Sequence, residues 1–330
     1  MTDANRRIVL AERPTTMVDE RTTRLEEGPV PSPGPGQALV RVTHLSIDPT
    51  IRGWMGRDTY LPAIGIGEVV RCAGLGQVVE SRREGVAVGD TVFGLLGWQD
   101  YAVVGDVNTV PPGVAPELAL GLLGVTGLTA YFGLIDVGHL AEGDVVVVSG
   151  AAGATGSVAG QVAKILGAGE VVGIAGSDEK CAWLLDTAGF DHAVNYKTEN
   201  VPKRLHDVCP DGIDLYWDNV GGDILDACLG QLAMHGRVVL CGAISQYATG
   251  AEPVGPANYL NLIGKRGRME GFIVLDYADR FPEAQAKLFE WAASGRIRTA
   301  EQIVDGLEQA PDALNMLFTG ANLGKVIVRV

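Results

Sequence analysis

The chain has 330 residues, 47% of them hydrophobic and 20% charged, a composition typical of a compact globular protein. One hydrophobic core rarely serves so long a chain, so we expect two domains. The formal net charge of −14 repels nucleic-acid phosphates and anionic lipid, which argues against both classes of partner. No apolar stretch approaches the ~20 residues of a membrane span, and Met1–Arg7 lacks the apolar core of a signal peptide. We therefore expect a cytoplasmic protein.

The first third of the chain is rich in short β-type runs separated by glycine and proline. Gly28–Gly36 cannot form a helix because proline lacks the amide donor, and it leads into an expected strand at Gln37–Val42. Turn signals at this spacing predict a small, mostly antiparallel, barrel-like unit. The further β-type runs are Gly65–Val70, Gly76–Glu80 and Gly89–Phe93.

After Pro112 the pattern changes, and strand-type and helix-type segments alternate. Pro116–Gly133 is rich in alanine and leucine and predicts a helix with a break near Gly124–Gly127. The alternation that follows predicts βαβ units and a parallel sheet, hence an α/β domain. Leu323–Val330 is again strand-like, and we expect it to return to the first domain. The expected strands are Asp144–Ser149, Glu170–Ala175, His192–Asn195, Ile213–Asn219 and Arg237–Cys241, and the expected helices are Thr155–Leu166 and Asp178–Thr187.

A glycine-rich turn between a strand and a helix is the strongest functional signal. Val145–Val148 is apolar on both faces, as a central parallel strand must be. In the turn that follows, Gly153 lets the backbone approach a pyrophosphate and Gly156 lets the helix pack close to the strand. Bound phosphates would lie at the positive end of the helix dipole. Ala151 replaces the first glycine of the G-x-G-x-x-G pattern, but the full strand–turn–helix context favours a dinucleotide site over a simple chain turn.

The residues after the second strand bear on the choice between NADH and NADPH. NAD enzymes carry an acidic residue about 20 positions beyond the turn, which binds the ribose hydroxyls. Counting from Gly156 reaches Gly176, so the acid is absent there, and Lys180 follows one helical turn later. A lysine can neutralise a 2′-phosphate, although it can also be a solvated side chain, and Asp178 is an alternative ribose ligand. We expect NADPH ahead of NADH.

The cysteines and histidines form no metal-binding pattern. The five cysteines are scattered and odd in number, and none of the five histidines forms a His-x-x-His pair. Zinc sites need three or four such ligands brought close together. We therefore expect neither a zinc ion nor a disulfide framework.

Several motifs occur in order along nearly the whole chain: Arg6–Leu10, Leu45–Pro49 with Arg52, Gly127–Gly133, Gly153–Gly156, Gly176–Lys180, Asn195–Lys197, Asp218–Gly222, Cys241–Tyr247, Arg268–Phe272 and Asn322–Lys325. In this order they resemble the motifs of the medium-chain dehydrogenase/reductase superfamily. Within it, the chain is similar to the zinc-free, NADPH-dependent alkenal and prostaglandin reductases, which include bacterial curcumin reductase.

The resemblance implies a GroES-like catalytic domain of residues 1–124, completed by residues 302–330, and a Rossmann NADPH-binding domain of residues 125–301. It also implies a homodimer whose Rossmann sheets join edge to edge. Lys180 and Tyr196 match the residues that hold the 2′-phosphate of NADPH. The candidate cofactor-binding residues are Thr129, Gly153, Ala154, Thr155, Gly156, Gly176, Ser177, Lys180, Tyr196, Asn219, Cys241, Gly242, Ile244, Ser245, Tyr247, Phe272, Ile273, Val274 and Asn322.

The resemblance further implies reduction of the carbon–carbon double bond of a small enal or enone. Hydride reaches the β-carbon, and negative charge builds on the carbonyl oxygen as an enolate. Without a metal, hydrogen-bond donors must stabilise that oxygen, such as a ribose hydroxyl or a tyrosine. Tyr60 and Tyr259 match active-site tyrosines of related enzymes and are the candidate catalytic residues, although each can also line a cleft by packing alone.

One motif departs from the family pattern. Relatives usually read Asp-Pro-Tyr-Met-Arg where this chain has Asp48–Arg52 with Thr50 and Ile51. Both changes remove bulk beside the expected substrate site and predict an altered substrate preference. Three functions remain open: an NADPH-dependent double-bond reductase, an NADPH:quinone oxidoreductase, and a non-catalytic NADPH-binding protein.

Overall fold

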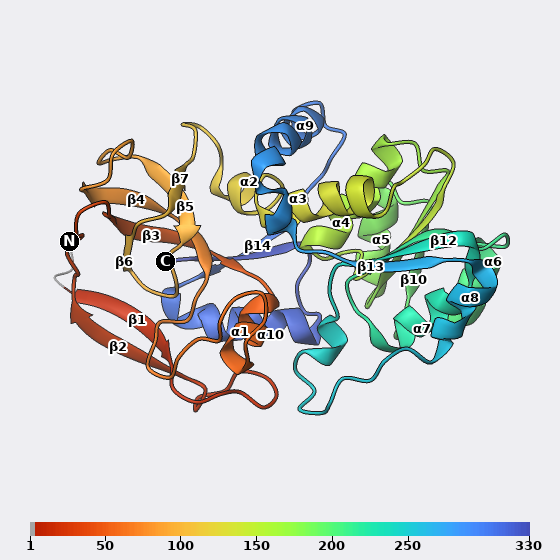
Figure 1. The fold of residues 1–330 in the computed structure, drawn as a ribbon, viewed down its shortest axis with the longest axis horizontal. Coiled ribbons are helices and arrows are strands. Elements are labelled where there is room, and N and C mark those ends of the chain that lie inside the picture. Colours follow the sequence, from red (N-terminus) through yellow and green to blue (C-terminus); the bar gives the residue numbers. More distant parts are fainter. Residues whose placement is uncertain (1–3) are drawn as a thin grey trace.

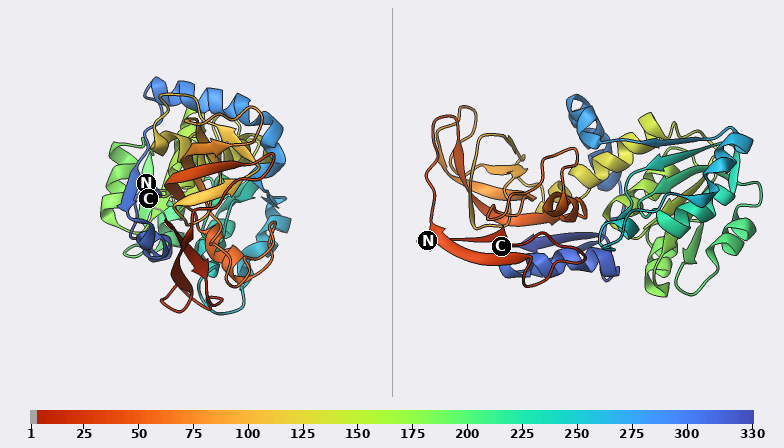
Figure 2. Two further views of the ribbon diagram at one scale, coloured as in Figure 1. Left: turned by 90° about the vertical axis from the view of Figure 1, so that its left-hand side faces the viewer. Right: turned by 60° about the horizontal axis from the view of Figure 1, so that its bottom comes forward.

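The computed structural model describes residues 4–330 and contains two large β-sheets in two halves of an elongated molecule (Figure 1). The half with the six-stranded sheet has helices around it, and the half with the seven-stranded sheet contains both chain ends (Figure 2). The expected α/β class is confirmed. Within residues 4–330, no helix has the length and apolar character needed to cross a membrane.

The six-stranded sheet is entirely parallel. Its strands are β8 (Val145–Ser149), β9 (Glu170–Ala175), β10 (His192–Asn195), β11 (Ile213–Asp218), β12 (Leu232–Leu240) and β13 (Arg268–Gly271). Their order in the sheet is β10-β9-β8-β11-β12-β13, so the direction of winding reverses between β8 and β11. In open α/β sheets, ligands bind beyond the carboxyl ends of the strands at such a switch point.

Both faces of this sheet are buried, which explains the unbroken apolar run in β8. Val146 and Val148 belong to one hydrophobic cluster, while Val147 belongs to the cluster on the other face. Side chains alternate between faces along a strand, so Trp217 and Tyr216 of β11 divide in the same way. The covering helices are α4 (Ala154–Ile165), α5 (Asp178–Asp186), α6 (Val201–Val208), α7 (Gly222–Gly230), α8 (Asn261–Lys265) and α9 (Phe281–Ala293).

The seven-stranded sheet joins the first third of the chain to its end. Its strands are β3 (Ala38–Ile47), β4 (Ala73–Ser81), β5 (Thr91–Leu95), β6 (Tyr101–Val104), β7 (Val107–Thr109), β14 (Glu301–Asp305) and β15 (Lys325–Arg329). Pairing is antiparallel except between β14 and β15. Because β15 pairs with β3, the C-terminal strand returns to the first part of the chain, as expected.

Shorter elements complete the fold. A separate hairpin of β1 (Ala4–Leu10) and β2 (Thr23–Pro29) precedes the seven-stranded sheet. Helices α1 (Thr50–Gly56), α2 (Pro116–Leu120) and α10 (Ala310–Thr319) lie with the seven-stranded sheet, whereas α3 (Val125–Phe132) and η1 (Gly133–Val137) pack in the same hydrophobic cluster as β8 and β11. The single-turn or irregular helices are η2 (Ile244–Gln246), η3 (Ala257–Leu260), η4 (Val274–Arg280) and η5 (Leu307–Gln309).

Three local expectations are corrected. The strand expected at Gly65–Val70 is wrong, because this stretch forms turns with only an isolated bridge at Val69. The helix break expected near Gly124–Gly127 lies slightly earlier, between α2 and α3. Strand β12 begins several residues before the expected start at Arg237, since its first part, from Leu232, pairs with β11 through a register shift. The bounds of these strands depend on which distant strands pair with them, and the local composition of a segment does not reveal its pairing partner.

The domain boundaries stay a proposal. The seven-stranded sheet takes its strands from residues 38–109 and 301–329, and the six-stranded sheet takes its strands from residues 145–271. A division into 1–124 with 302–330, and 125–301, is compatible with this allocation.

Gly160, in the middle of α4, tests the packing of the six-stranded half. A Cβ atom at Gly160 would lie 2.0 Å from the ring of Phe190, which is buried. We expect Gly160→Ala to lower the free energy of unfolding by about 1–3 kcal/mol, measured by urea unfolding, because overpacking displaces the ring. Gly264→Ala in α8 is the matched control, since nothing lies within 4 Å of a Cβ there. Equal effects of the two variants would contradict the predicted close contact.

Candidate functional site

Most candidate residues follow the carboxyl ends of the parallel strands. Strands β8, β9, β11 and β12 end at Ser149, Ala175, Asp218 and Leu240. We call this side of the sheet the switch-point edge. Parallel strands place all their carboxyl ends on one side, so segments far apart in the sequence meet here.

The turn between β8 and α4 leaves backbone amides free. Gly150 adopts a left-handed conformation with φ 57°, and Gly153 is the N-cap of α4. A Cβ atom at Gly156 would lie 2.4 Å from the carbonyl oxygen of Gly150, so only glycine lets the helix start this close to the strand. The first turn, with Ala154 and Thr155, contains no acidic residue. Its amides and the positive end of the helix dipole are therefore available to an anion.

The ends of β9 and β10 bring the second group of candidates together. A Cβ atom at Gly176 would lie 2.9 Å from the ring of Tyr196, so this contact requires glycine. The hydroxyl of Ser177 caps α5 by accepting a hydrogen bond from the amide of Lys180 at 3.3 Å. The Tyr196 side chain is 43% exposed, so it is open to a ligand.

Two lysines, Lys180 and Lys197, lie at this end of the site beside the acidic first turn of α5. Lys180 is half-buried, and burial together with the nearby charge of Lys197 lowers its pKa. Its Nζ donates a hydrogen bond to the carbonyl oxygen of Gly320 at 2.9 Å. Asp178, the alternative ribose ligand, is already engaged, because the side-chain amide of Asn195 donates to its Oδ1 at 2.7 Å. The arrangement favours an anionic ligand at this point.

A buried carboxylate organises the end of β11. Asp218 is 1% exposed. Its Oδ1 accepts hydrogen bonds from the hydroxyls of Tyr216 at 2.7 Å and Ser149 at 3.1 Å. The same oxygen accepts from the amides of Val220 at 3.0 Å and Gly221 at 2.9 Å. Burial raises the pKa of Asp218, and these hydrogen bonds oppose the rise. They fix the turn that carries Asn219.

Asn219 links this turn back to β8. Its side-chain amide donates a hydrogen bond to the carbonyl oxygen of Ser149 at 2.6 Å, and its Oδ1 accepts from the indole N–H of Trp217 at 3.1 Å. With both ends of the side-chain amide engaged, Asn219 is held between the two strands on either side of the switch point.

The segment after β12 is tied to the same turn by its main chain. The amides of Cys241 and Gly242 donate to the carbonyl oxygen of Asp218 at 2.9 and 3.0 Å. The amide of Ile244 donates to the carbonyl oxygen of Asn219, and the amide of Ser245 donates to that of Val220, at 3.1 Å each. These candidates therefore lie beside the glycine turn.

Four further candidates lie at the border of the core. The ring of Phe272 meets a buried tryptophan of β11 edge-on, with centroids 6.2 Å apart, so its side chain belongs to the core. Val274 is 8% exposed, and Ile273 lies between the two. A ligand would therefore meet this stretch mainly through its backbone. The hydroxyl of Thr129, on α3, donates to the carbonyl oxygen one turn earlier at 2.7 Å.

The end of the chain also reaches the glycine turn. The amide of Gly324 donates to the carbonyl oxygen of Ala152 at 2.8 Å, and Gly324 forms a bridge with Gly153. Asn322, which is 8% exposed, donates from its side-chain amide to the carbonyl oxygen of Gly324 at 3.0 Å. Asn322 is thereby brought to the residues of the switch-point edge.

Tyr60 of the seven-stranded half approaches Tyr247 of the switch-point edge. Burial raises the pKa of Tyr60, a hydrogen bond with Thr50 lowers it, and the nearby Tyr247 adds to the rise. The hydroxyl oxygen of Tyr247 accepts a hydrogen bond from the amide of Ala243 at 3.0 Å, so its own proton is free to be donated. Burial raises the pKa of Tyr247 as well. Both phenols therefore stay protonated at neutral pH.

Of the two residues that depart from the family motif, Thr50 and Ile51, only Thr50 lies beside Tyr60. Ile51 is 1% exposed and packs in the core of the seven-stranded half. The expectation that Ile51 removes bulk beside the substrate site is wrong, because adjacent residues of a helix point in different directions.

Tyr259 lies on η3. This element is attached to α7 through Asn258, whose amide donates to Oδ1 of Asp226 at 2.9 Å. The Tyr259 side chain is 53% exposed. Its catalytic role stays a prediction.

Among residues 4–330, no three histidine, cysteine or acidic side chains form a group able to hold a metal ion. All five cysteines are free thiols. Cys72, Cys209 and Cys228 are buried in hydrophobic clusters, which accounts for them without a metal.

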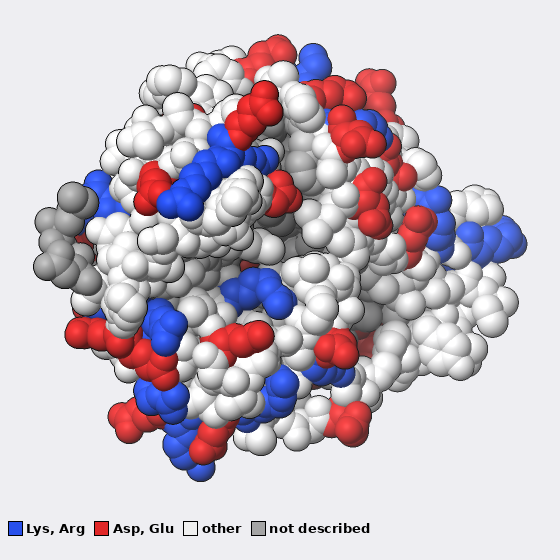
Figure 3. Space-filling model, turned by 60° about the vertical axis from the view of Figure 1, so that its left-hand side comes forward, with Lys and Arg blue, Asp and Glu red and all other residues white. Residues whose placement is uncertain are grey.

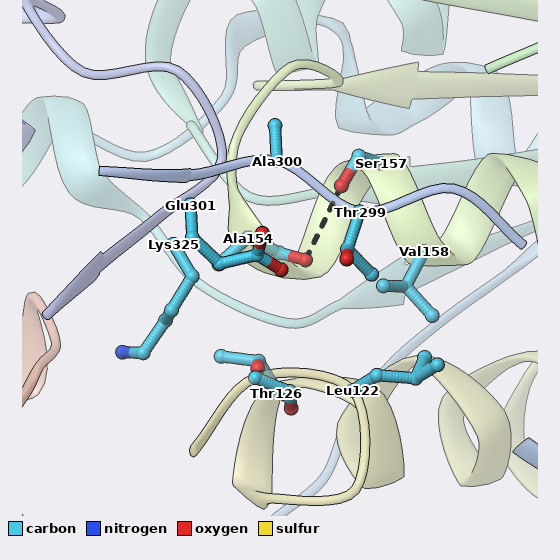
Figure 4. A pocket seen from close by; sticks show the side chains of 10 residues that line it. Leu122, Thr126, Ala154, Ser157, Val158, Thr299, Ala300, Glu301 and Lys325 are labelled. Atoms are coloured by element: carbon cyan, nitrogen blue, oxygen red, sulfur yellow. Dashed lines mark hydrogen bonds between the residues drawn. The ribbon is translucent and has the colours of Figure 1, made fainter. Parts of the chain in front are cut away.

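A small cavity of about 10 Å³ lies where α3, α4 and the chain before β14 meet, with room for roughly one water molecule. Thr126, Ser157, Thr299 and Lys325 are among its lining residues (Figure 4). On the face drawn in Figure 3, acidic and basic side chains are interspersed around a central hollow. No broad positive surface is present on that face.

Three residues of this site were not among the sequence candidates. Lys197 and Asp218 both lie within quoted motifs, and their place after a strand was the available signal. Gly320 carried no signal, because its part in the site is a main-chain carbonyl from a helix C-terminus.

Cys241 provides a test of the electrostatics at the switch-point edge. Burial, followed by the charge of Asp218, raises the pKa of the Cys241 thiol to about 12. The reactive thiolate is therefore scarce at neutral pH, and we expect iodoacetamide at pH 7.5 to leave Cys241 essentially unmodified in the folded protein, measured by peptide mass spectrometry. The same treatment in urea is the control and should label all five cysteines. Rapid labelling of Cys241 in the folded protein would show a thiolate that this geometry does not support.

Comparisons with known proteins agree with this arrangement. Residues 6–111 match the family described as the N-terminal domain of oxidoreductase, and residues 154–291 match the family described as zinc-binding dehydrogenase. The chain is 40% identical to the NADPH-dependent curcumin reductase of Escherichia coli, covering 99% of this chain and 97% of that protein. It is 39% identical to the NADP(+)-dependent 2-alkenal reductase of Nicotiana tabacum, covering 90% and 88%.

Among solved structures, CurA of Vibrio vulnificus in complex with NADPH superimposes with a TM-score of 0.93 at 40% identity, covering 98% of this chain and 99% of that one. The identity extends over nearly the full length of the chain and includes both sheets. The chain therefore belongs to the medium-chain dehydrogenase/reductase family of oxidoreductases.

Proposed function

We propose that this protein is an NADPH-dependent reductase of the carbon–carbon double bond of α,β-unsaturated aldehydes and ketones, and that it uses no metal. The observation that carries the proposal is the hydroxyl of Tyr247, which accepts a hydrogen bond from the amide of Ala243 at 3.0 Å in the segment after β12 and keeps its own proton free for a ligand. Relatives of about 40% identity that are named curcumin reductase and 2-alkenal reductase support the same substrate class.

NADPH is the cofactor, and the residues of the switch-point edge fit it. The free amides at the start of α4 suit the pyrophosphate, since no acidic side chain opposes an anion there. Ser177, Lys180 and Tyr196 would hold the 2′-phosphate, with Lys197 adding positive charge. The remaining cofactor candidates would line the nicotinamide side.

The chain's part in the chemistry is to stabilise negative charge on the substrate oxygen. NADPH, when bound, supplies the hydride that reaches the β-carbon. The carbonyl oxygen then gains negative charge as an enolate, and a neutral phenol held nearby lowers the energy of that charge. Tyr247 is well suited to this, because the amide of Ala243 fixes its oxygen while its proton stays free. Tyr60, whose ring packs edge-on against Trp54 with centroids 6.0 Å apart, is the second donor.

Zinc does not fit the side chains present. A catalytic zinc needs three nitrogen, sulfur or oxygen ligands around one point. Among the described residues no such group exists, so we derive no step through zinc despite the name of the matching family.

We also propose a homodimer joined through β13, which ends the sheet with one edge unpaired within residues 4–330. A cytoplasmic location stays a prediction.

The cofactor assignment predicts a selective effect at Lys180. A charge-assisted hydrogen bond contributes roughly 1.5–3 kcal/mol, so Lys180→Ala should raise KM for NADPH about tenfold to a hundredfold and leave KM for NADH nearly unchanged. Lys203→Ala, which removes an exposed lysine from α6, is the matched control for loss of one charge. An equal loss for both cofactors would make Lys180 a structural residue.

The reaction assignment predicts where the label goes. With a simple enone, deuterium on the transferring face of NADPH should appear at the β-carbon of the product, and solvent deuterium at the α-carbon, by NMR. Label at the carbonyl carbon of an allylic alcohol would overturn the assignment. Faster turnover of quinones than of enones would favour an NADPH:quinone oxidoreductase. Turnover of neither would favour a non-catalytic NADPH-binding protein. A chelator should leave the activity intact.

The kcat for enone reduction by phenylalanine variants compares the catalytic contributions of the three tyrosines. Loss of one oxyanion donor can cost about 10²–10³ in kcat, but a ribose hydroxyl can share the charge, so we expect Tyr247→Phe and Tyr60→Phe to lose about tenfold each. Tyr259→Phe is compared alongside them, and its loss of activity decides whether the prediction for Tyr259 holds. Full activity in all three variants would leave the enolate without a protein donor.

A further inference from the structure

The segment that follows α10 touches the cofactor site at two separate points. We call residues 320–325 the C-terminal bridge. At its first residue, the carbonyl oxygen of Gly320 accepts a hydrogen bond from Nζ of Lys180 at 2.9 Å. Near its end, the amide of Gly324 donates to the carbonyl oxygen of Ala152 at 2.8 Å. The bridge thus spans from the lysine pair to the glycine turn.

We propose that the main-chain carbonyl of Gly320 determines cofactor specificity by positioning the Lys180 ammonium for the 2′-phosphate of NADPH. The preference for NADPH over NADH is then set by both halves of the molecule. This inference rests on the proposed role of Lys180 as the 2′-phosphate ligand.

The hydrogen bond to Gly320 orients a side chain that is otherwise free to rotate. A lysine ammonium is a compact charge on a flexible stem and has three N–H donors. One donor is used by Gly320, and two remain for a phosphate. Lys180 is half-buried, between the like charge of Lys197 and the opposite charge of Glu179, and its ammonium is directed to the Gly320 carbonyl. An ammonium already directed at the site loses less conformational entropy when the phosphate binds.

The conformation of Gly320 makes its carbonyl available. Gly320 caps the C-terminus of α10 in the left-handed conformation, with φ 67°. Carbonyls at a helix C-terminus lack partners within the helix and lie at the negative end of its dipole, which favours a lysine ammonium. A side chain at this position is strained, and valine especially so, whereas asparagine adopts the conformation readily.

The rest of the bridge holds this carbonyl in place. A Cβ atom at Gly324 would lie 1.8 Å from the carbonyl oxygen of Ala300, so the bridge is packed tightly against the chain before β14. Lys325, which is 3% exposed, forms an ion pair with Asp48 at 2.6 Å. Gly320 is therefore attached to the seven-stranded sheet at one end of the bridge and presents its carbonyl to α5 at the other.

The test compares Gly320→Val, which disfavours the left-handed cap, with Gly320→Asn, which preserves it at similar bulk. Gly320→Ala is a milder variant for use if the valine variant does not fold. Two quantities are measured: the ratio of kcat/KM for NADPH to that for NADH, and the affinity for adenosine 2′,5′-bisphosphate relative to 5′-AMP by calorimetry. The second readout needs no turnover.

We expect Gly320→Val to lower both ratios by about threefold to tenfold, the range that a single hydrogen bond commands, and Gly320→Asn to keep them near wild type. In a Lys180→Ala background, Gly320→Val should change the ratios no further, because the residue through which it acts is gone.

Each other outcome has a distinct meaning. Equal loss for both cofactors in Gly320→Val, or unchanged ratios, would overturn the inference about Gly320 while leaving Lys180 as the phosphate ligand. Unchanged ratios in Lys180→Ala alone would instead overturn the proposed role of Lys180. A further loss caused by Gly320→Val in the double variant would show that the glycine acts by another route.

Discussion

The buried carboxylate of Asp218 is the constraint on which the cofactor site depends. One of its oxygens accepts four hydrogen bonds, two from hydroxyls of β8 and β11 and two from amides of the next turn. Its main-chain carbonyl accepts two more from the segment after β12. The other oxygen, Oδ2, is buried and has no hydrogen-bond partner among the described residues, so Oδ1 alone ties these groups together. Three strand ends and two cofactor-lining segments thereby acquire fixed relative positions.

Around this centre the site is built mostly from main-chain groups. Glycine at position 156 brings α4 against its strand, and glycine at position 176 allows contact with Tyr196. The protein is strongly acidic, with a net charge of −14, so we propose that local amides and the lysines Lys180 and Lys197 attract the anionic cofactor. In the proposed reaction, protonated tyrosines stabilise the substrate oxygen, and burial raises the pKa values of Tyr60 and Tyr247.

Much of this was open to prediction from the sequence. The apolar run in β8 and the glycines after it predicted a central parallel strand, a phosphate-binding turn and the helix α4, because period and turn chemistry are local properties. The missing acid at Gly176 and the lysine after it predicted NADPH for the same reason. Predictions failed where pairing partners are distant: Gly65–Val70 lacks a continuous partner strand, and the start of β12 at Leu232 gains one. Ile51 was misplaced because a motif match does not report which side of a short helix faces the core.

The sequence by itself determined the α/β class, the glycine-rich turn, the family and the preferred cofactor, since periodicity and turn chemistry are local and the ordered family motifs can be matched without knowing which residues meet. Only the tertiary structure decided which residues meet. It brought Tyr60 near Tyr247, engaged Asp178 with Asn195, and placed the carbonyl of Gly320 on Lys180. These contacts join segments separated by tens to hundreds of residues, and one of them uses a main-chain atom that every residue possesses. Such contacts leave no local pattern, because they arise only when the sheets have formed and the chain end has returned.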